Sequence, residues 1–237
     1  MVNYEVAVKK PFTDLKKLSI GILLSIIPIV NLVVTGFAIE SSGVGKTKPS
    51  KKMPEWKNWW YLFVKGLAAV VIKIIYMIPA FVVIVVAIGF AIGDIASALM
   101  GTVITPELMS QIRAGQAPTE QIGMIFRENW YLILPAIMKV APIFLVGLLL
   151  ALIASFLTPM AVLNYVKNRK FSAAFDLGTV TRKALTGKYL LVWIVVIVLT
   201  IILGAVLAFI PILGVAIALF LLSVIGYSLY GQVYREV

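Results

Sequence analysis

The amino-acid sequence predicts an all-α, polytopic integral membrane helical bundle. We expect four full transmembrane helices, a broken or re-entrant N-terminal hydrophobic element and in-plane amphipathic helices. The first observation is composition: of 237 residues, 62% are hydrophobic and only 13% are charged. A soluble domain averages about 45–50% apolar and about 25% charged residues. A chain of this length cannot bury so much apolar surface in one core, which excludes a soluble enzyme or regulator.

The second observation is the length of the apolar runs. Crossing the hydrocarbon core of a bilayer takes about 20 residues of helix. Four runs reach that length, namely 66–92, 131–157, 189–210 and 212–230. We therefore expect a single transmembrane domain over residues 1–237, with these four runs as its spans.

The third observation is the placement of charge. Lys and Arg total 21 against 10 Asp and Glu, and the basic residues flank apolar runs, which is typical of the positive-inside rule and not of a nucleic-acid-binding protein. The two basic loops contain Lys46, Lys48, Lys51, Lys52, Lys57 and Lys65, and then Lys167, Arg169, Lys170, Arg182, Lys183 and Lys188. Residues 94–130 hold more acidic than basic side chains. This predicts a multi-pass protein of the cell (cytoplasmic) membrane, with the lysine-rich loops and the C-terminus in the cytoplasm and 94–130 outside.

The apolar run at 18–39 departs from this pattern. Pro28 and Asn31 lie at its centre, and an interior proline removes a hydrogen bond and kinks or breaks a helix. Lysines stand on both sides of the run, so a re-entrant hairpin keeps both basic flanks inside, whereas a simple crossing puts one of them outside. We favour the hairpin and keep the crossing as the alternative. Residues 208–214 echo residues 25–31 around Pro211, which supports a hairpin at both places unless the similarity is chance.

Two segments next to the basic loops have features of surface helices. In 54–65, the side chains of Trp56, Trp59, Trp60 and Phe63 recur at i, i+3, i+4 and i+7, one face of a helix. Tryptophan favours the headgroup level, so we expect these four residues to anchor an in-plane helix. The alternative is that residues 54–65 form the solvent-exposed end of a longer transmembrane helix. A weaker candidate covers 171–188, where Ser172 is the expected cap and Asp176 is expected to pair loosely with Lys170 or Arg182.

The segment 94–130 contains two helix starts. Thr105-Pro106-Glu107 and Ala117-Pro118-Thr119-Glu120 each put proline in a first turn beside an acid. We expect two short helices, separated near Gly115, that form a small outer cap.

The side-chain inventory gives little support to catalysis. The chain has no Cys and no His, so it has no thiolate or imidazole base and no thiolate-bound metal. Gly43-Val44-Gly45-Lys46-Thr47 is similar to the end of a phosphate-binding loop, but Glu40 stands where that motif needs glycine. We expect no catalytic residue, metal or cofactor, and we interpret 43–47 as a flexible loop.

Two lysines inside the apolar runs are the remaining candidates. An intramembrane charge is a functional hypothesis by default. Lys73 and Lys139 each lie near the start of a run, from which a lysine side chain can extend to the interface. The alternative is that they line a polar cavity together with Pro79 and Asn31, although a structural role of Asn31 beside the proline break is favoured. Asp94 is expected to be an interfacial residue at a helix end.

Several motifs together resemble one family. Pro54-Glu55-Trp56-Lys57-Asn58-Trp59, Leu62-Phe63-Val64-Lys65-Gly66-Leu67 and Ile74-Ile75-Tyr76-Met77-Ile78-Pro79 are similar to strings in the largely archaeal membrane proteins grouped as domain of unknown function 4013. Residues 27–31 and 171–176 also look like that family. One departure is Lys57-Asn58, where the family is often acidic. The resemblance covers most of the chain and implies an architecture, with no assigned activity and no catalytic residues.

These observations favour a non-enzymatic membrane protein, a lipid-contacting scaffold or accessory subunit. Its expected partners are anionic membrane lipids, a membrane protein or a second copy of itself, and no nucleic acid. The residues expected to contact anionic lipid are Lys46, Lys48, Lys51, Lys52, Lys167, Arg169 and Lys170. The alternative function is a small-solute transporter or channel with a cavity between kinked helices, and an intramembrane enzyme is the third candidate.

Overall fold

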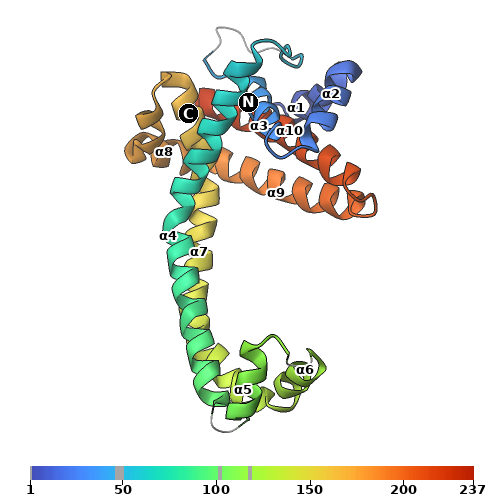
Figure 1. Cartoon of the computed structure of the whole chain (residues 1–237). Helices are drawn as coiled ribbons and strands as arrows, with labels where there is room; N and C mark the ends of the chain where they lie inside the picture. The colour runs from blue at the N-terminus through green and yellow to red at the C-terminus, as the bar shows by residue number, and fades with distance from the viewer. Residues whose placement is uncertain (1, 46–50, 101–102, 117–118) are drawn as a thin grey trace. The chain divides into compact units, whose positions relative to one another are not determined.

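The computed structural model describes residues 2–45, 51–100, 103–116 and 119–237 (Figure 1). These residues are almost all helical and form no named strand, so the all-α prediction is confirmed. Four helices are long and apolar enough to cross a membrane, which fits a multi-pass membrane protein. The chain divides into two compact units: unit 1 comprises Met1–Tyr76 and Ser155–Val237, and unit 2 comprises Met77–Ala154.

The four long helices cover the four predicted spans, except for residues 208–210 and 212, and differ from them in extent. They are α4 (Trp59–Leu99), α7 (Trp130–Asn168), α9 (Gly187–Leu207) and α10 (Leu213–Glu236). Helix α4 continues through Pro79. Helices α4 and α7 are about a dozen residues longer than the apolar runs 66–92 and 131–157, because both apolar and polar residues outside each run continue the helix. Hydropathy therefore located the spans but not the helix ends.

The N-terminal element is broken, as predicted. After α1 (Tyr4–Lys9) and η1 (Lys10–Thr13), helices α2 (Leu15–Ser25) and α3 (Asn31–Ser41) flank the turn that contains Pro28. The side chain of Asp14 caps α2 by accepting a hydrogen bond from the Lys17 N–H at 3.1 Å. Each arm has 11 residues, which is about 16 Å at 1.5 Å per residue. That is roughly half the thickness of a hydrocarbon core.

Helix α10 is the centre of unit 1. It packs against α9, α3, α2 and α1, and 56% of its most apolar stretch is buried against 6% for α9. Two close approaches need glycine: a Cβ atom at Gly21 of α2 would lie 2.0 Å from the Phe220 ring, and one at Gly231 would lie 2.3 Å from the carbonyl oxygen of Ser42. The α2–α3 hairpin therefore docks directly on α10.

The second proline motif also forms a hairpin, as predicted. Helix α9 ends at Leu207, and Ala208–Ile212 turn the chain into α10. Ile212 has φ of 61°, which is rare for a β-branched residue. Helices α9 and α10 contact each other. The echo between 25–31 and 208–214 thus marks two turns between packed helices.

The separate surface helix predicted over 54–65 was wrong. Residues 54–58 are not helical, and Trp59–Lys65 form the first turns of α4. The periodic pattern correctly predicted a helix from Trp59 onward, but Trp56 lies in the loop before that helix. The alternative interpretation, the end of a longer helix, matches the observed helix boundaries.

The segment 171–188 contains two short helices, η2 (Phe171–Phe175) and α8 (Leu177–Ala184), followed by the start of α9. Asp176, and not Ser172, caps α8, because its side chain accepts a hydrogen bond from the Thr179 N–H at 3.1 Å. A hydrogen bond from the Thr179 side chain, then this N–H bond and the nearby Arg182, hold the pKa of Asp176 below its ordinary value. We expected the Asp176 carboxylate mainly to pair loosely with Lys170 or Arg182. That prediction was wrong about its main role, which is to cap α8.

Unit 2 contains the later part of α4, the earlier part of α7, and two short helices between them, α5 (Pro106–Arg113) and α6 (Thr119–Glu128). Both short helices were predicted. Thr105 caps α5, and Gly115 follows it with φ of 69°. The predicted start at Ala117-Pro118 lies outside the described residues. Helices α4 and α7 approach closely at Gly147, where a Cβ atom would lie 2.5 Å from Ile84.

Candidate functional site

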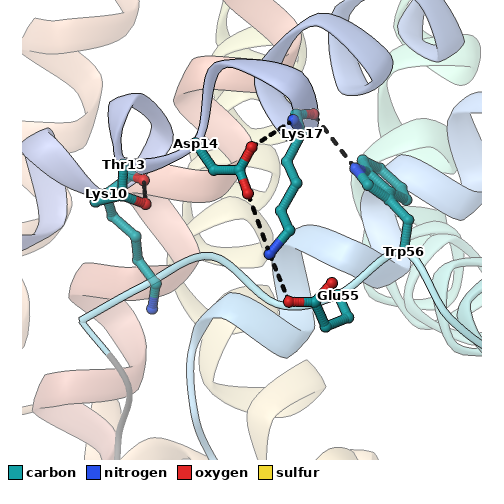
Figure 2. A network of polar contacts seen from close by, with 6 residues as sticks. All are labelled: Lys10, Thr13, Asp14, Lys17, Glu55 and Trp56. Atoms are coloured by element: carbon teal, nitrogen blue, oxygen red, sulfur yellow. Dashed lines mark hydrogen bonds and ion pairs between the residues drawn. The ribbon is translucent and has the colours of Figure 1, made fainter.

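The loop before α4 is clipped to the start of α2 (Figure 2). The Lys17 ammonium group lies 2.7 Å from Glu55 and 3.4 Å from Asp14. The hydrogen bond to Glu55 raises the pKa of Lys17, and the same bond lowers the pKa of Glu55. The indole N–H of Trp56 donates to the Lys17 carbonyl oxygen at 3.3 Å. This clip, formed by Asp14, Lys17, Glu55 and Trp56, joins two segments that are distant in sequence.

Trp56 packs inside unit 1. Its ring stacks on that of Phe37 at 3.8 Å between centroids, and Trp59 stacks on its other side at 5.6 Å. Phe37 is fully buried. Of the four predicted anchors, Trp56 is half-buried in this stack, while Trp59 and Trp60 are exposed at the start of α4 and Phe63 stacks on Trp60 at 5.6 Å. Membrane anchoring remains a prediction for Trp59, Trp60 and Phe63.

Helices α3 and α4 cross at two glycines. A Cβ atom at Gly66 would lie 1.8 Å from the Leu32 carbonyl oxygen, and a Cβ atom at Gly36 would lie 1.9 Å from the Leu62 carbonyl oxygen. Small residues allow such backbone approach in membrane helices. The crossing therefore excludes any side chain at both positions.

A buried polar network joins α7, α8 and α10. The Tyr234 hydroxyl donates to Asn164 Oδ1 at 2.7 Å, and Asn164 Nδ2 donates to the Ala173 carbonyl oxygen at 2.8 Å. The Lys183 ammonium group lies 4.3 Å from the Tyr234 ring centre and donates to the Tyr234 carbonyl oxygen at 3.1 Å. Burial, then the nearby Lys167, lowers the pKa of Lys183. Every polar side chain in this network has a partner.

The segment 171–175 is also held by Tyr76. The Tyr76 hydroxyl donates to the Ala174 carbonyl oxygen at 2.7 Å, and its ring stacks on Phe175 at 5.9 Å. The motif residues Glu55, Trp56 and Tyr76 thus make contacts that assemble unit 1. Their chemistry is structural: they join helices and form no reactive constellation.

Five basic side chains converge on the ends of α3 and α10, and we call this cluster the basic end. Its members are Lys10, Lys65, Lys183, Lys188 and Arg235. Lys10 donates to the Ser41 carbonyl oxygen at 2.5 Å, and Arg235 donates to that of Ser42 at 2.6 Å. Lys65 pairs with Glu40, Lys183 contacts Tyr234, and Lys188 lies 2.9 Å from Glu236. All five therefore contact residues 40–42 or 234–236.

Two of these cations stabilise the C-terminus of α3. The last carbonyl groups of a helix lack intrahelical donors, and basic side chains satisfy them and the negative end of the helix dipole. Lys10 does so while only 5% exposed. Beside it, Lys10, Lys51 and Arg235 line a polar pocket of about 300 Å³. The basic end thus joins both ends of the α2–α3 hairpin, since Lys10 precedes the hairpin and Ser41 closes it.

The residues predicted to contact anionic lipid lie near this region where they are described. Lys51 and Lys52 are exposed, as are Lys167, Arg169 and Lys170. Lys46 and Lys48 lie outside the described residues. A Cβ atom at Gly45 would lie 3.8 Å from the Val166 carbonyl oxygen, so the chain enters the first basic loop next to the end of α7, where the second begins.

The residues of the alternative cavity are divided between the units. Asn31 and Lys73 belong to unit 1, and Pro79 and Lys139 belong to unit 2. Asn31 is the first residue of α3, and Lys73 is exposed. Lys139 is also exposed and pairs with Asp94 at 2.9 Å. Within either unit, these residues do not form one site.

Sequence reasoning missed the structural importance of three positions. Gly36 and Gly66 lie in apolar runs, where small residues are a signal of close helix packing, and that signal was available. Buried Lys10 had no such signal, because its partner Ser41 is distant in sequence. Among the described residues, no group of three or more His, Cys, Asp or Glu could hold a metal ion.

Comparison with known proteins identifies a family and no function. No curated protein and no solved structure matches the chain. A family model described as "Protein of unknown function (DUF4013)" matches residues 20–212, from α2 to the turn before α10. The matched range includes the proline-containing hairpin, the clip residues Glu55 and Trp56, and Tyr76. The chain therefore belongs to the DUF4013 family.

Proposed function

We propose that this protein is a non-enzymatic membrane protein that contacts anionic lipids of one leaflet through its basic end and the adjoining lysine loops. The observation that supports this most directly is that the exposed side chains of Lys51, Lys52, Lys167, Arg169 and Lys170 lie beside the basic end, where the chain enters the first basic loop next to the end of α7. A lysine close to an anionic surface contributes about 1 kcal/mol to binding. Several together favour an anionic leaflet strongly.

The proposal includes a topology. Because both ends of the α2–α3 hairpin meet at the basic end, the hairpin enters and leaves the bilayer on one side. Its 11-residue arms match about half of a hydrocarbon core, and Ile27 and Ile29 at its tip are exposed apolar residues. The positive-inside rule then puts the basic end in the cytoplasm. This arrangement keeps every lysine-rich flank on one side.

We also propose a scaffold or accessory role for a membrane-protein partner or a second copy of the chain. Support comes from α9, whose most apolar stretch is only 6% buried. The absence of Cys and His from the sequence removes the commonest general bases and nucleophiles, which supports a role other than catalysis. The transporter alternative has weaker support, because Lys73 and Lys139 are exposed and Lys139 pairs with Asp94.

Tryptophan quenching by brominated lipids tests the lipid preference. Trp59 and Trp60 are exposed beside the basic end, so their fluorescence reports the nearest lipids. In reconstituted vesicles, brominated phosphatidylglycerol should quench more than brominated phosphatidylcholine. The difference should disappear at about 1 M salt, where the Debye length is about 3 Å.

Matched variants localise the effect. Replacing Lys51 and Lys52 with Gln should reduce the preference for phosphatidylglycerol, whereas replacing Arg113 and Arg127 with Gln removes the same charge from exposed sites in unit 2 and should not. Equal quenching by the two lipids at low salt would refute the proposed function.

A further inference from the structure

A second pocket lies within unit 1, between the start of α4 and the end of α7. It has a volume of about 430 Å³ and is lined by Asn58, Tyr61, Lys65, Tyr165 and Arg169. These side chains supply an amide, two phenols, an ammonium group and a guanidinium group, all of which donate hydrogen bonds. The pocket is therefore rich in donors for an oxyanion.

The charges of the pocket leave one cation available. Lys65 is buried and pairs with Glu40, which also accepts a hydrogen bond from the Tyr61 hydroxyl at 3.4 Å. Arg169 is exposed, and its guanidinium group forms no ion pair with any residue that the structure describes. The charged side chains of the lining are those of Lys65 and Arg169, and because Lys65 is paired with Glu40 outside the lining, Arg169 is the cation left for a ligand. This matches a ligand with a single negative charge.

The backbone at Arg169 favours a ligand-binding role. Arg169 has φ of 55°, in the left-handed region that a bulky residue rarely adopts and that glycine commonly fills at the end of a helix. Its N–H donates to the Tyr165 carbonyl oxygen at 2.8 Å, so the turn closes α7. Asn58, opposite it in the pocket lining, also has a positive φ, of 53°. Strained residues of this kind concentrate at ligand sites.

The exposed aromatic residues next to the pocket are of the kind that lies at the depth of the lipid phosphate groups. Trp59, Trp60 and Tyr61 are exposed in the first turn of α4, and Trp and Tyr concentrate at the membrane–water interface. Asn58 directly precedes this aromatic group in sequence, and Asn58, Tyr61 and Arg169 line the same pocket. The first N–H groups of α4 add positive potential on the same side.

We propose that this pocket binds a phosphate group that carries one negative charge, as in the phosphodiester of a phospholipid headgroup, with Arg169 as its main ligand. This inference rests on the proposed function. It adds one defined binding pocket to the exposed basic surface that attracts anionic lipids. Arginine pairs with phosphate through two parallel hydrogen bonds. A lipid held in this way resists salt, unlike lipids attracted by the lysine loops.

Native mass spectrometry tests the site. The full-length protein is saturated with phosphatidylglycerol in detergent, washed at about 1 M salt to screen surface charges, and the retained lipid is counted. The wild-type protein should retain one phosphatidylglycerol, and Arg169→Gln should lower its occupancy at least about tenfold. Arg113→Gln is the matched control, since it removes the same guanidinium group from an exposed position in unit 2 and should retain the lipid.

Two further arms identify the recognised group. Diacylglycerol, which has the acyl chains without the phosphate, should not be retained. Inorganic phosphate that displaces the lipid would show that the phosphate group alone is sufficient, and failure to displace it would assign the source as a lipid; both results are consistent with the site. Arg169→Lys should restore part of the retention, and unchanged thermal unfolding of Arg169→Gln excludes a folding defect.

Three results would overturn the site: retention by Arg169→Gln equal to wild type, loss in Arg113→Gln as large as in Arg169→Gln, or equal retention of diacylglycerol. If the site is overturned while low-salt quenching still favours anionic lipid, the proposed function stands without it. If that quenching preference is absent while Arg169-dependent retention persists, the site stands and the wider lipid role is refuted.

Discussion

Replacing Gly66 with Ala should destabilise unit 1 more than any other single methyl addition on α4. The added Cβ atom would lie 1.8 Å from the Leu32 carbonyl oxygen, whereas ordinary contact begins at 3.4 Å. Helices α3 and α4 would have to separate by roughly 1.6 Å, because the obstacle is backbone and cannot rotate away. Overpacking of a core typically costs about 1–3 kcal/mol, and a backbone clash lies at the upper end, near 3 kcal/mol.

The assay is thermal unfolding in detergent, followed by intrinsic fluorescence. A loss of about 3 kcal/mol lowers Tm by roughly 6–12 °C for a chain of this size. Separation of α3 from α4 should also disturb the Phe37–Trp56 stack, which shifts tryptophan emission to longer wavelength. Gly89→Ala is the matched control on the same helix, since a Cβ atom there has nothing within 4 Å and Ala is the better helix former. Equal Tm changes for the two variants would refute the close-crossing argument.

Two further predictions concern polar contacts. Because Lys17 holds the pKa of Glu55 below its ordinary 4.5, the clip's ion pair stabilises the fold above that pH and is lost as pH falls through the lowered pKa. Trp56 emission, taken as wild type minus Trp56→Phe, should therefore change at acidic pH, and a transition of the same size in Glu55→Gln would count against the ion pair. Tyr234→Phe removes one of two donors to buried Asn164 Oδ1, the other being Asn168 Nδ2, and should cost about 0.5–1.5 kcal/mol of unfolding free energy. In thermal unfolding, Tyr131→Phe, at an exposed site, should change the stability by less than about 0.5 kcal/mol, and a similar loss in both variants would exclude the network as the cause.

The parts of the fold that follow from local chemistry could be predicted from the sequence. The four spans could be predicted from the length of the apolar runs, because a helix of about 20 apolar residues is what crossing the hydrocarbon core requires. The break near Pro28 follows from the missing N–H and fixed φ of proline. The two short helices between α4 and α7 follow from Thr105 and from proline in the first turn. In each case the cause lies within a few residues of its effect.

The parts that depend on distant partners could not be predicted. Trp56 fits the helical periodicity of 54–65, yet Phe37 and Lys17 hold it in a loop. Asp176 has a basic neighbour at Lys170, but the free N–H of Thr179 at the start of α8 is the better partner. Tertiary contacts override a local pattern in the first case, and capping overrides a surface ion pair in the second.

The candidate site, too, has features that could be predicted from the sequence and features that depend on distant partners. That basic residues would lie next to the ends of the spans was predictable from their positions in the sequence. That Lys10 would be buried against Ser41, or that Arg169 would line a pocket with Tyr61, depended on the α2–α3 hairpin folding back and on the end of α7 meeting the start of α4. These approaches are set by packing at positions such as Gly36 and Gly66.

Cysteine accessibility in sealed vesicles tests the topology most directly, because the chain has no native cysteine. Single cysteines replace Thr13, Lys52, Lys170 and Glu107, all exposed, and a membrane-impermeant maleimide is applied from one side. We expect positions 13, 52 and 170 to react from the same side and position 107 only from the other. Reaction of positions 13 and 52 from opposite sides would contradict the re-entrant hairpin and the one-sided basic end.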